Sequence, residues 1–169
     1  GAMDALTPEY IPEDIIAKAA AVVVSAYPLR AVGQPIQLAM ARLLDLAKRH
    51  NVPVVMSLGT KHLVEEHREL ILATVNEYVD MLAMNELEAE ALTGLSDPLL
   101  AAEAALELTN MVLVTAGPEG LYLCGYTDAT MQRETTNPIK SGALPEYNQF
   151  EISRPMQKQD CQEPVKVYS

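Results

Sequence analysis

The sequence predicts one α/β domain, a three-layer sandwich in which a mostly parallel sheet carries helices on both faces and ends in an antiparallel hairpin. Four short apolar runs, at 20–26, 52–58, 79–84 and 111–116, begin roughly 30 residues apart, as the strands of right-handed βαβ units do. The runs lack polar alternation, which is typical of strands covered on both faces. Segments with a helical apolar period separate them.

These intervening segments predict the covering helices. Residues 11–19 predict a short helix before the first strand, and residues 60–75 predict a longer one after the second strand. Between them, residues 34–49 predict the clearest helix, because Pro35 suits its first turn and one stripe of its surface is apolar: Ile36, Met40, Leu43, Leu44 and Ala47.

Residues 86–108 predict two helices, because the sequence TGLSDP interrupts them. Gly94 can close the first helix. Either Ser96 or Asp97 can cap the second, and Pro98 suits its first position. The chain order is therefore α-β-α-β-α-β-α-α-β.

After residue 116 the pattern changes, because LYLCGY follows GPEG too soon for a crossover helix. Residues 111–125 therefore predict the hairpin, with Pro118 and Glu119 at the centre of a type I turn and Gly120 after them. Residues 126–169 predict a long loop followed by a terminal strand of the same domain. The α/β core is expected at 4–125, and residues 1–3 resemble an expression-tag scar.

Composition excludes several classes of function. The formal net charge of −11 argues against binding to nucleic acid or to an anionic membrane, and no apolar window is long enough to span a bilayer. Cys124 and Cys161 have neither CxxC spacing nor a nearby histidine, so they predict no metal site and no disulfide framework. These features favour a cytoplasmic protein.

The carboxyl end of the third strand carries Asn85 and Glu88. In open α/β sheets, ligands bind at this edge. An Asn followed three residues later by a Glu is close to the capping box that begins a helix, and the spacing alone favours that interpretation. The same carboxylate and amide could orient hydrated Mg²⁺ and a nucleotide phosphate, and one pair of residues can do both.

The fourth strand ends in Thr115, Gly117 and Gly120. An ordinary hairpin explains this spacing best. The alternative is that the glycines let backbone N–H groups approach a phosphate beside the Thr115 hydroxyl. The sequence contains neither GxxxxGK[ST] nor GxGxxG after a strand, so the loop is neither a Walker loop nor a dinucleotide fingerprint.

Arg30 follows the first strand and could reach a phosphate or a polar base edge as a forked donor, although an exposed arginine is more often only solvated. Lys61 and His62 are equally compatible with the solvated start of a helix. Nothing in the sequence places a histidine near a nucleophile, so hydrolase function is disfavoured.

The segment MNELEAEALTG and the later segment LVTAGPEGLYL together resemble the ribokinase-like (PfkB) family of sugar and nucleoside kinases. Asn85 and Glu88 match its Asn-x-x-Glu motif. Its nucleotide loop, Val-Thr-x-Gly-x-x-Gly, is matched by Val114, Thr115, Gly117 and Gly120. The resemblance implies a ribokinase-like fold and a phosphotransferase that uses ATP and Mg²⁺. It also implies nucleotide contacts from Asn85, Thr115, Ala116, Gly117 and Gly120. Glu88 would then act on the metal through water or phosphate.

Further tracts, among them IPEDIIAKAAAVVVSAYPLR, NVPVVMSLGTK and EYNQFEISRPM, are similar to the family's bacterial purine-nucleoside kinases. They span nearly the whole chain from residue 5 to residue 169. The implied reaction transfers the ATP γ-phosphate to the 5′-hydroxyl of inosine or guanosine in purine salvage, with Arg30 expected at the nucleoside. The resemblance leaves homo-oligomer formation open.

Two departures from the family pattern qualify this expectation. The Gly-Ala-Gly-Asp motif that supplies the family's anion hole and catalytic base is absent, and SGALPE at 141–146 does not replace it. We therefore expect a middle fragment, inactive by itself, with the catalytic Asp beyond Ser169 and the N-terminal substrate region upstream of Asp4. SLGT at 57–60 replaces the Asp-containing turn of many sugar kinases. The alternatives are a kinase for another small sugar or nucleoside and a non-catalytic nucleotide-binding module.

Overall fold

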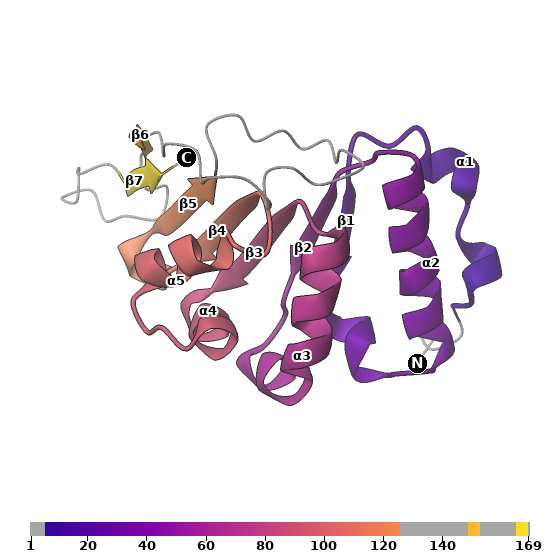
Figure 1. Cartoon of the computed structure of the whole chain (residues 1–169), viewed down its shortest axis with the longest axis horizontal. Helices are drawn as coiled ribbons and strands as arrows, with labels where there is room; N and C mark the ends of the chain where they lie inside the picture. The colour runs from indigo at the N-terminus through magenta and orange to yellow at the C-terminus, as the bar shows by residue number, and fades with distance from the viewer. Residues whose placement is uncertain (1–5, 126–148, 153–164, 169) are drawn as a thin grey trace.

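In the described part of the chain, the fold is built on one sheet of seven strands in the order β1-β2-β3-β4-β5-β7-β6 (Figure 1). The computed structural model describes residues 6–125, 149–152 and 165–168. Strand β5 (Leu121–Gly125) is antiparallel to its neighbour β4, which confirms the hairpin. The four strands before it are parallel, which confirms the predicted sheet: β1 (Val22–Ser25), β2 (Val54–Ser57), β3 (Met81–Asn85) and β4 (Met111–Thr115).

The C-terminal strands extend the sheet beyond the hairpin. Strand β7 (Val165–Tyr168) pairs parallel with β5 and corresponds to the predicted terminal strand. Strand β6 (Gln149–Ile152) pairs antiparallel with β7 and falls inside the segment predicted to be a loop. The sequence QFEI alternates polar and apolar residues, which is the period of a strand. The other residues of that predicted loop, and the predicted scar at 1–3, lie outside the described residues.

The helices also follow the prediction closely. The described α-helices are α1 (Glu13–Ile16), α2 (Pro35–Arg49), α3 (Lys61–Tyr78), α4 (Glu86–Thr93) and α5 (Pro98–Ala105), and three 3₁₀ turns accompany them: η2 (Pro8–Tyr10), η3 (Tyr27–Arg30) and η4 (Gly117–Glu119). Gly94 closes α4 at a φ of 81°, a conformation that favours glycine. Asp97, not Ser96, caps α5 by accepting the Leu99 and Leu100 N–H groups. None of these helices has the length and apolar character needed to cross a bilayer.

The helices α2 to α5 lie on one face of the sheet (Figure 1). The expected second helical layer is not present among the described residues. The strand order explains this difference. Strands β1 to β4 are added in the same direction along the sheet, and right-handed crossovers that always step the same way place every connecting helix on the same face.

The sheet is apolar on both faces but is covered on one. Side chains that face the helices are buried in the core, among them Val54, Met56, Leu82, Met84, Val112 and Val114. Their neighbours along each strand point the other way. Of these, Val55, Met81 and Leu113 are half-buried, and Val23 is 76% exposed. The apolar pattern of the strands predicted that both faces would be covered. On the second face, these apolar side chains are instead partly exposed.

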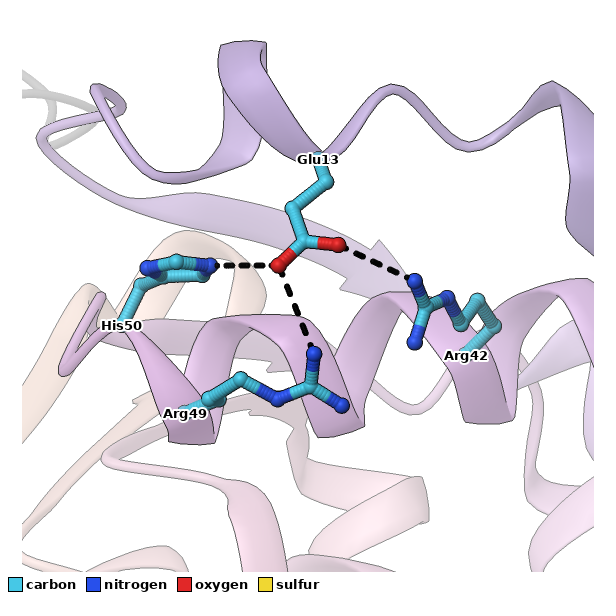
Figure 2. Close-up of polar contacts among 4 residues, drawn as sticks. All are labelled: Glu13, Arg42, Arg49 and His50. Carbon is cyan, nitrogen blue, oxygen red and sulfur yellow. Dashed lines mark hydrogen bonds and ion pairs between the residues drawn. The ribbon is translucent and has the colours of Figure 1, made fainter.

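An ionic cluster holds α1 against α2 (Figure 2). Glu13 contacts three basic side chains, two within α2 and one at the residue that ends this helix. Its Oε2 accepts from Arg42 Nη2 at 3.1 Å, and its Oε1 lies 3.3 Å from Arg49 Nη1 and 3.0 Å from His50 Nε2. The hydrogen bond with His50, followed by the charges of Arg49 and Arg42, lowers the pKa of Glu13 below its ordinary value.

Candidate functional site

Asn85 and Glu88 form a complete capping box at the carboxyl end of β3. The Asn85 side chain accepts the Glu88 N–H at 2.9 Å, and the Glu88 Oε2 accepts the Asn85 N–H at 3.1 Å. A third hydrogen bond, from Asn85 Nδ2 to Glu88 Oε1 at 3.0 Å, joins the two side chains. The capping interpretation is therefore confirmed. The geometry leaves room for a second role, because two donors occupy only part of what a carboxylate can accept.

Glu88 is 4% exposed as a residue, although it stands at the sheet edge where open α/β folds typically bind ligands. Burial raises its pKa above the ordinary value, the neighbouring Glu86 charge adds to that shift, and the hydrogen bonds from Asn85 oppose it. An ionised carboxylate in this position lacks the solvation that water would provide. A cation or an ordered water would therefore stabilise it.

Thr115 lies directly opposite Asn85, because the parallel register of β3 and β4 pairs these two residues. The two motifs that the sequence singled out, some thirty residues apart, thus end at one point of the sheet edge. Thr115 is exposed, and its hydroxyl can donate to an anion there.

The loop after Thr115 is a tight turn that uses some of its own amide groups. Gly120 N–H donates to Gly117 O at 3.2 Å, which encloses Pro118 and Glu119 as predicted, and Ala116 N–H donates to Gly120 O at 2.8 Å. Gly117 and Gly120 have φ angles of 50° and 106°, which favour glycine. The amides of Ala116 and Gly120 are therefore occupied in this conformation. The nucleotide contacts assigned to this loop stay a prediction.

Polar residues also follow the carboxyl end of β2, at the same edge of the sheet. Thr60 caps α3 by accepting the Leu63 N–H, and Lys61 in the first turn of that helix lies 3.0 Å from Glu90 of α4. The hydrogen bond to Glu90 raises the pKa of Lys61. Lys61 thereby ties the start of α3 to the helix that Asn85 caps.

Arg30 and Tyr27 stand at the carboxyl end of β1. The Arg30 Cζ lies 5.0 Å from the centroid of the Tyr27 ring, which is cation–π geometry. Both residues line a cavity of about 700 Å³, within the range of small-molecule sites. Adjacent strands are about 4.8 Å apart, so this corner lies about 10 Å from the end of β3.

The predicted site residues thus divide into two groups along one edge of the sheet. Asn85, Glu88 and Thr115 come together, and Arg30 stands two strands away. Sequence reasoning missed Tyr27, Gly59 and Glu90. The aromatic ring three residues before Arg30 was the one local signal for this corner of the site.

A buried carboxylate at this edge fits a magnesium ion, which typically keeps several waters and takes few protein oxygens beside substrate phosphates. Glu88 supplies that carboxylate. The described residues contain no group of three or more His, Cys, Asp or Glu side chains arranged to hold a metal. The arrangement therefore suits an ion shared with a bound phosphate and not a closed protein site.

Solved structures share this architecture. Adenosine kinase from Sinorhizobium meliloti matches with a TM-score of 0.66 and 23% identity, over 72% of this chain and 37% of that chain. A putative ribokinase II from E. coli, solved with ATP and Mg²⁺, matches with a TM-score of 0.60 and 16% identity, over 88% of this chain and 44% of that chain. At these identities the likeness shows the fold, which is ribokinase-like and partial here.

Sequence comparison is more specific. Guanosine-inosine kinase from Escherichia coli strain K12 is 48% identical over 170 residues, which cover all of this chain but only 39% of that kinase. The relative of the same name from E. coli O157:H7 matches equally well. The sequence also matches the pfkB family carbohydrate kinases over residues 1–141. Because that match covers most of the chain and includes both motifs at the sheet edge, the chain belongs to the pfkB family of carbohydrate kinases.

Proposed function

We propose that this chain is part of an ATP-dependent kinase that phosphorylates the 5′-hydroxyl of inosine or guanosine in cytoplasmic purine salvage. The register that places Asn85 opposite Thr115 carries the proposal, because it joins the two family motifs at the ligand edge of the sheet. The 48% identity to guanosine-inosine kinase supports the choice of substrate.

We assign each residue a part that suits its position. Thr115 donates its hydroxyl to a nucleotide phosphate, and the loop around Ala116, Gly117 and Gly120 follows the phosphate chain. Asn85 fixes the start of α4, whose first N–H groups favour an anion. Glu88 would hold Mg²⁺ through water or phosphate, and the ion would neutralise charge on the phosphates.

The 169-residue chain contains no Gly-Ala-Gly-Asp sequence, so it lacks the family's source of a catalytic base. Phosphoryl transfer depends on positioning and on charge stabilisation. We expect no measurable turnover from this chain alone, whereas the longer protein that contains it should be active.

The proposal is tested by assaying the longer protein with ATP, Mg²⁺ and either inosine or guanosine. Formation of the nucleoside monophosphate is the expected result, and its absence would contradict the proposal. A panel containing ribose, fructose and pyrimidine nucleosides separates this function from that of another small-sugar or nucleoside kinase. ATP binding without turnover of any acceptor would favour the non-catalytic module.

Glu88→Ala in the longer protein separates the chemical role of this residue from its structural one. Loss of the Glu88 half of the capping box should cost on the order of 1 kcal/mol of stability, whereas loss of the metal partner should lower kcat far more than the folded fraction accounts for. Glu103→Ala, on the neighbouring helix α5, is the matched control. If activity per folded molecule survives in Glu88→Ala, the residue is only a cap.

A further inference from the structure

Arg30 and Tyr27 form a preorganised pair in the lining of the cavity. The guanidinium lies over the aromatic face, 5.0 Å from its centroid, and both residues belong to the single turn η3. A guanidinium carries five N–H donors in a fixed plane and no acceptor. Stacking on a ring holds that plane in one orientation and leaves its edge available to a ligand.

Gly59, in the loop after β2, makes room for the Tyr27 ring. A Cβ at this position would lie 3.1 Å from Tyr27 Cδ2, closer than the 3.5–4.0 Å of a comfortable carbon contact. Its φ of 95° also favours glycine. The Tyr27 ring thus packs against the loop after β2, and Arg30 of the same turn η3 stacks on the ring. These two contacts fix the guanidinium at the carboxyl ends of β1 and β2.

The cavity beside this pair suits a flat, mostly apolar ligand. Its walls come from β1, α2 and the N-terminal segment, including Val24, Ile36, Met40 and Leu43. Besides Arg30 and Tyr27, Ser25 is the polar side chain among the described lining residues. A purine base has apolar faces and a polar edge, so it matches a site that is apolar with one cation.

We infer that the Arg30 guanidinium, held by Tyr27, pairs with the O6 and N7 acceptors of a 6-oxopurine and thereby favours inosine and guanosine over adenosine. This inference rests on the proposed function and assigns the base-reading residue of that site. Guanine presents two acceptors on this edge, whereas adenine presents an acceptor and the N6 amino donor. A side chain that only donates satisfies the first pattern and leaves a donor facing a donor in the second.

The test compares nucleosides on the longer kinase. For the unmodified enzyme we expect kcat/KM to favour guanosine over adenosine. Arg30→Gln presents one donor and one acceptor, so it should lower that ratio by about tenfold to a hundredfold, mainly by raising the KM for guanosine. Arg49→Gln, the same change at the opposite end of α2, should leave the ratio unchanged.

Analogues locate the contact on the base. Purine riboside lacks O6 and 7-deazaguanosine lacks N7, so each should bind the unmodified enzyme more weakly than guanosine does. In Arg30→Ala, which keeps no donor, the penalty for 7-deazaguanosine should largely disappear. Tyr27→Phe keeps the ring and should keep the guanosine preference, whereas Tyr27→Ala should reduce it because the guanidinium loses its platform.

The outcomes separate this inference from the function on which it rests. If no nucleoside is phosphorylated by the unmodified enzyme, the proposed function fails and the inference fails with it. If guanosine is phosphorylated but Arg30→Gln leaves the guanosine-to-adenosine ratio unchanged, only the inference is overturned. An equal loss for all nucleosides and analogues would also overturn it, because Arg30 would then contact a group that they share.

Discussion

Glu88 combines a place in a helix cap with burial at the edge of the sheet. Its carboxylate accepts the backbone N–H and the side-chain amide of Asn85, while its own N–H, in the first turn of α4, donates to Asn85 Oδ1. Glu88 remains almost completely buried, so the ionised carboxylate has a desolvation cost that the two hydrogen bonds it accepts do not cancel. That residual cost is the property that makes a nearby cation or water favourable.

We expect Glu88→Gln to change how stability depends on pH. Because burial raises the folded-state pKa of Glu88 above its ordinary value of 4.5, the folded state binds more protons than the unfolded state between these two values. The free energy of unfolding of the unmodified chain therefore falls as pH rises through that window. Gln carries no charge and lacks this dependence.

Thermal melts of both proteins from about pH 4 to about pH 7 measure the effect. The Tm of the unmodified chain should fall relative to that of Glu88→Gln as the pH rises. Glu103→Gln, on an adjacent helix, controls for the general loss of one negative charge. A slope of the opposite sign would mean that the hydrogen bonds from Asn85 outweigh the cost of burial.

Only the local part of the site was predictable from the sequence. Asn85 and Glu88 are three residues apart, so their spacing alone predicted the capping box. The contact between Tyr27 and Gly59 joins two different strand ends, and the pair of Lys61 and Glu90 joins two helices. Such contacts depend on the order and register of the strands, which no local pattern encodes.

At the scale of single elements, α1 depends on its neighbours. It is four residues long, too short to be stable as an isolated helix. Glu13 attaches it to three basic groups around the C-terminal half of α2 (Figure 2). Positive charge near the C-terminus of a helix is itself favourable, so the cluster suits both elements.

Glu13→Gln should loosen α1 while the rest of the domain stays folded. Amide hydrogen exchange in residues 13–17 should become several-fold faster, whereas the exchange rates of β2 and β3 and the overall Tm should change little, because exposed ion pairs contribute little to global stability. Asp14→Asn, one residue away, is the matched control.

The pH dependence of this difference has a definite sign. The folded-state pKa of Glu13 is lowered, so its contribution is present above the ordinary value and is lost as the pH falls through the lowered value. The unmodified chain and Glu13→Gln should therefore exchange alike in strong acid and differ at neutral pH. Equal exchange rates at neutral pH would show that the cluster does not hold α1.

Helix boundaries were predictable where capping residues mark them. The break between α4 and α5 followed from Gly94 and the Ser-Asp-Pro sequence, and the structure selects Asp97 as the cap. Helix α3 was predicted to end at residue 75, yet it continues to Tyr78. The final turn has no glycine or proline to end it, and the strand that follows supplies the stop.

For the whole molecule, the main feature is a sheet with one covered face and one partly open face. The open face carries Val23, Val55, Met81 and Leu113. Strand β1 also has an edge with no pairing strand among the described residues, and its sequence VVVS contains no charge that would oppose pairing with another chain.

We expect the isolated 169-residue chain to self-associate as its concentration rises, because apolar faces and unprotected strand edges drive association. Val23→Lys places a charge on both the open face and the edge strand and should shift the chain toward monomer. Leu100→Lys, at a 51% exposed position of α5 on the helical side, should not. Sedimentation velocity over a hundredfold concentration range measures this; a monomer throughout would contradict the expectation.

The strand positions and the parallel sheet were predictable because each strand is a short apolar run at βαβ spacing. The covering of the second face of the sheet was not predictable. Val55 and Met81 are apolar residues on the second face, and an apolar face is typical of a surface that is covered. Sequence pattern cannot say which segment covers such a surface, because that depends on strand order and crossover handedness.

The order of the strands also bears on how the protein is made. From β1 to β5, each strand lies beside the strand that precedes it in the chain. A polypeptide leaving the ribosome from its N-terminus therefore has a strand edge ready for its newest strand, and between β1 and β4 the intervening helix can cover each pair before the next strand emerges. This part of the sheet can assemble during translation in the order in which it is synthesised.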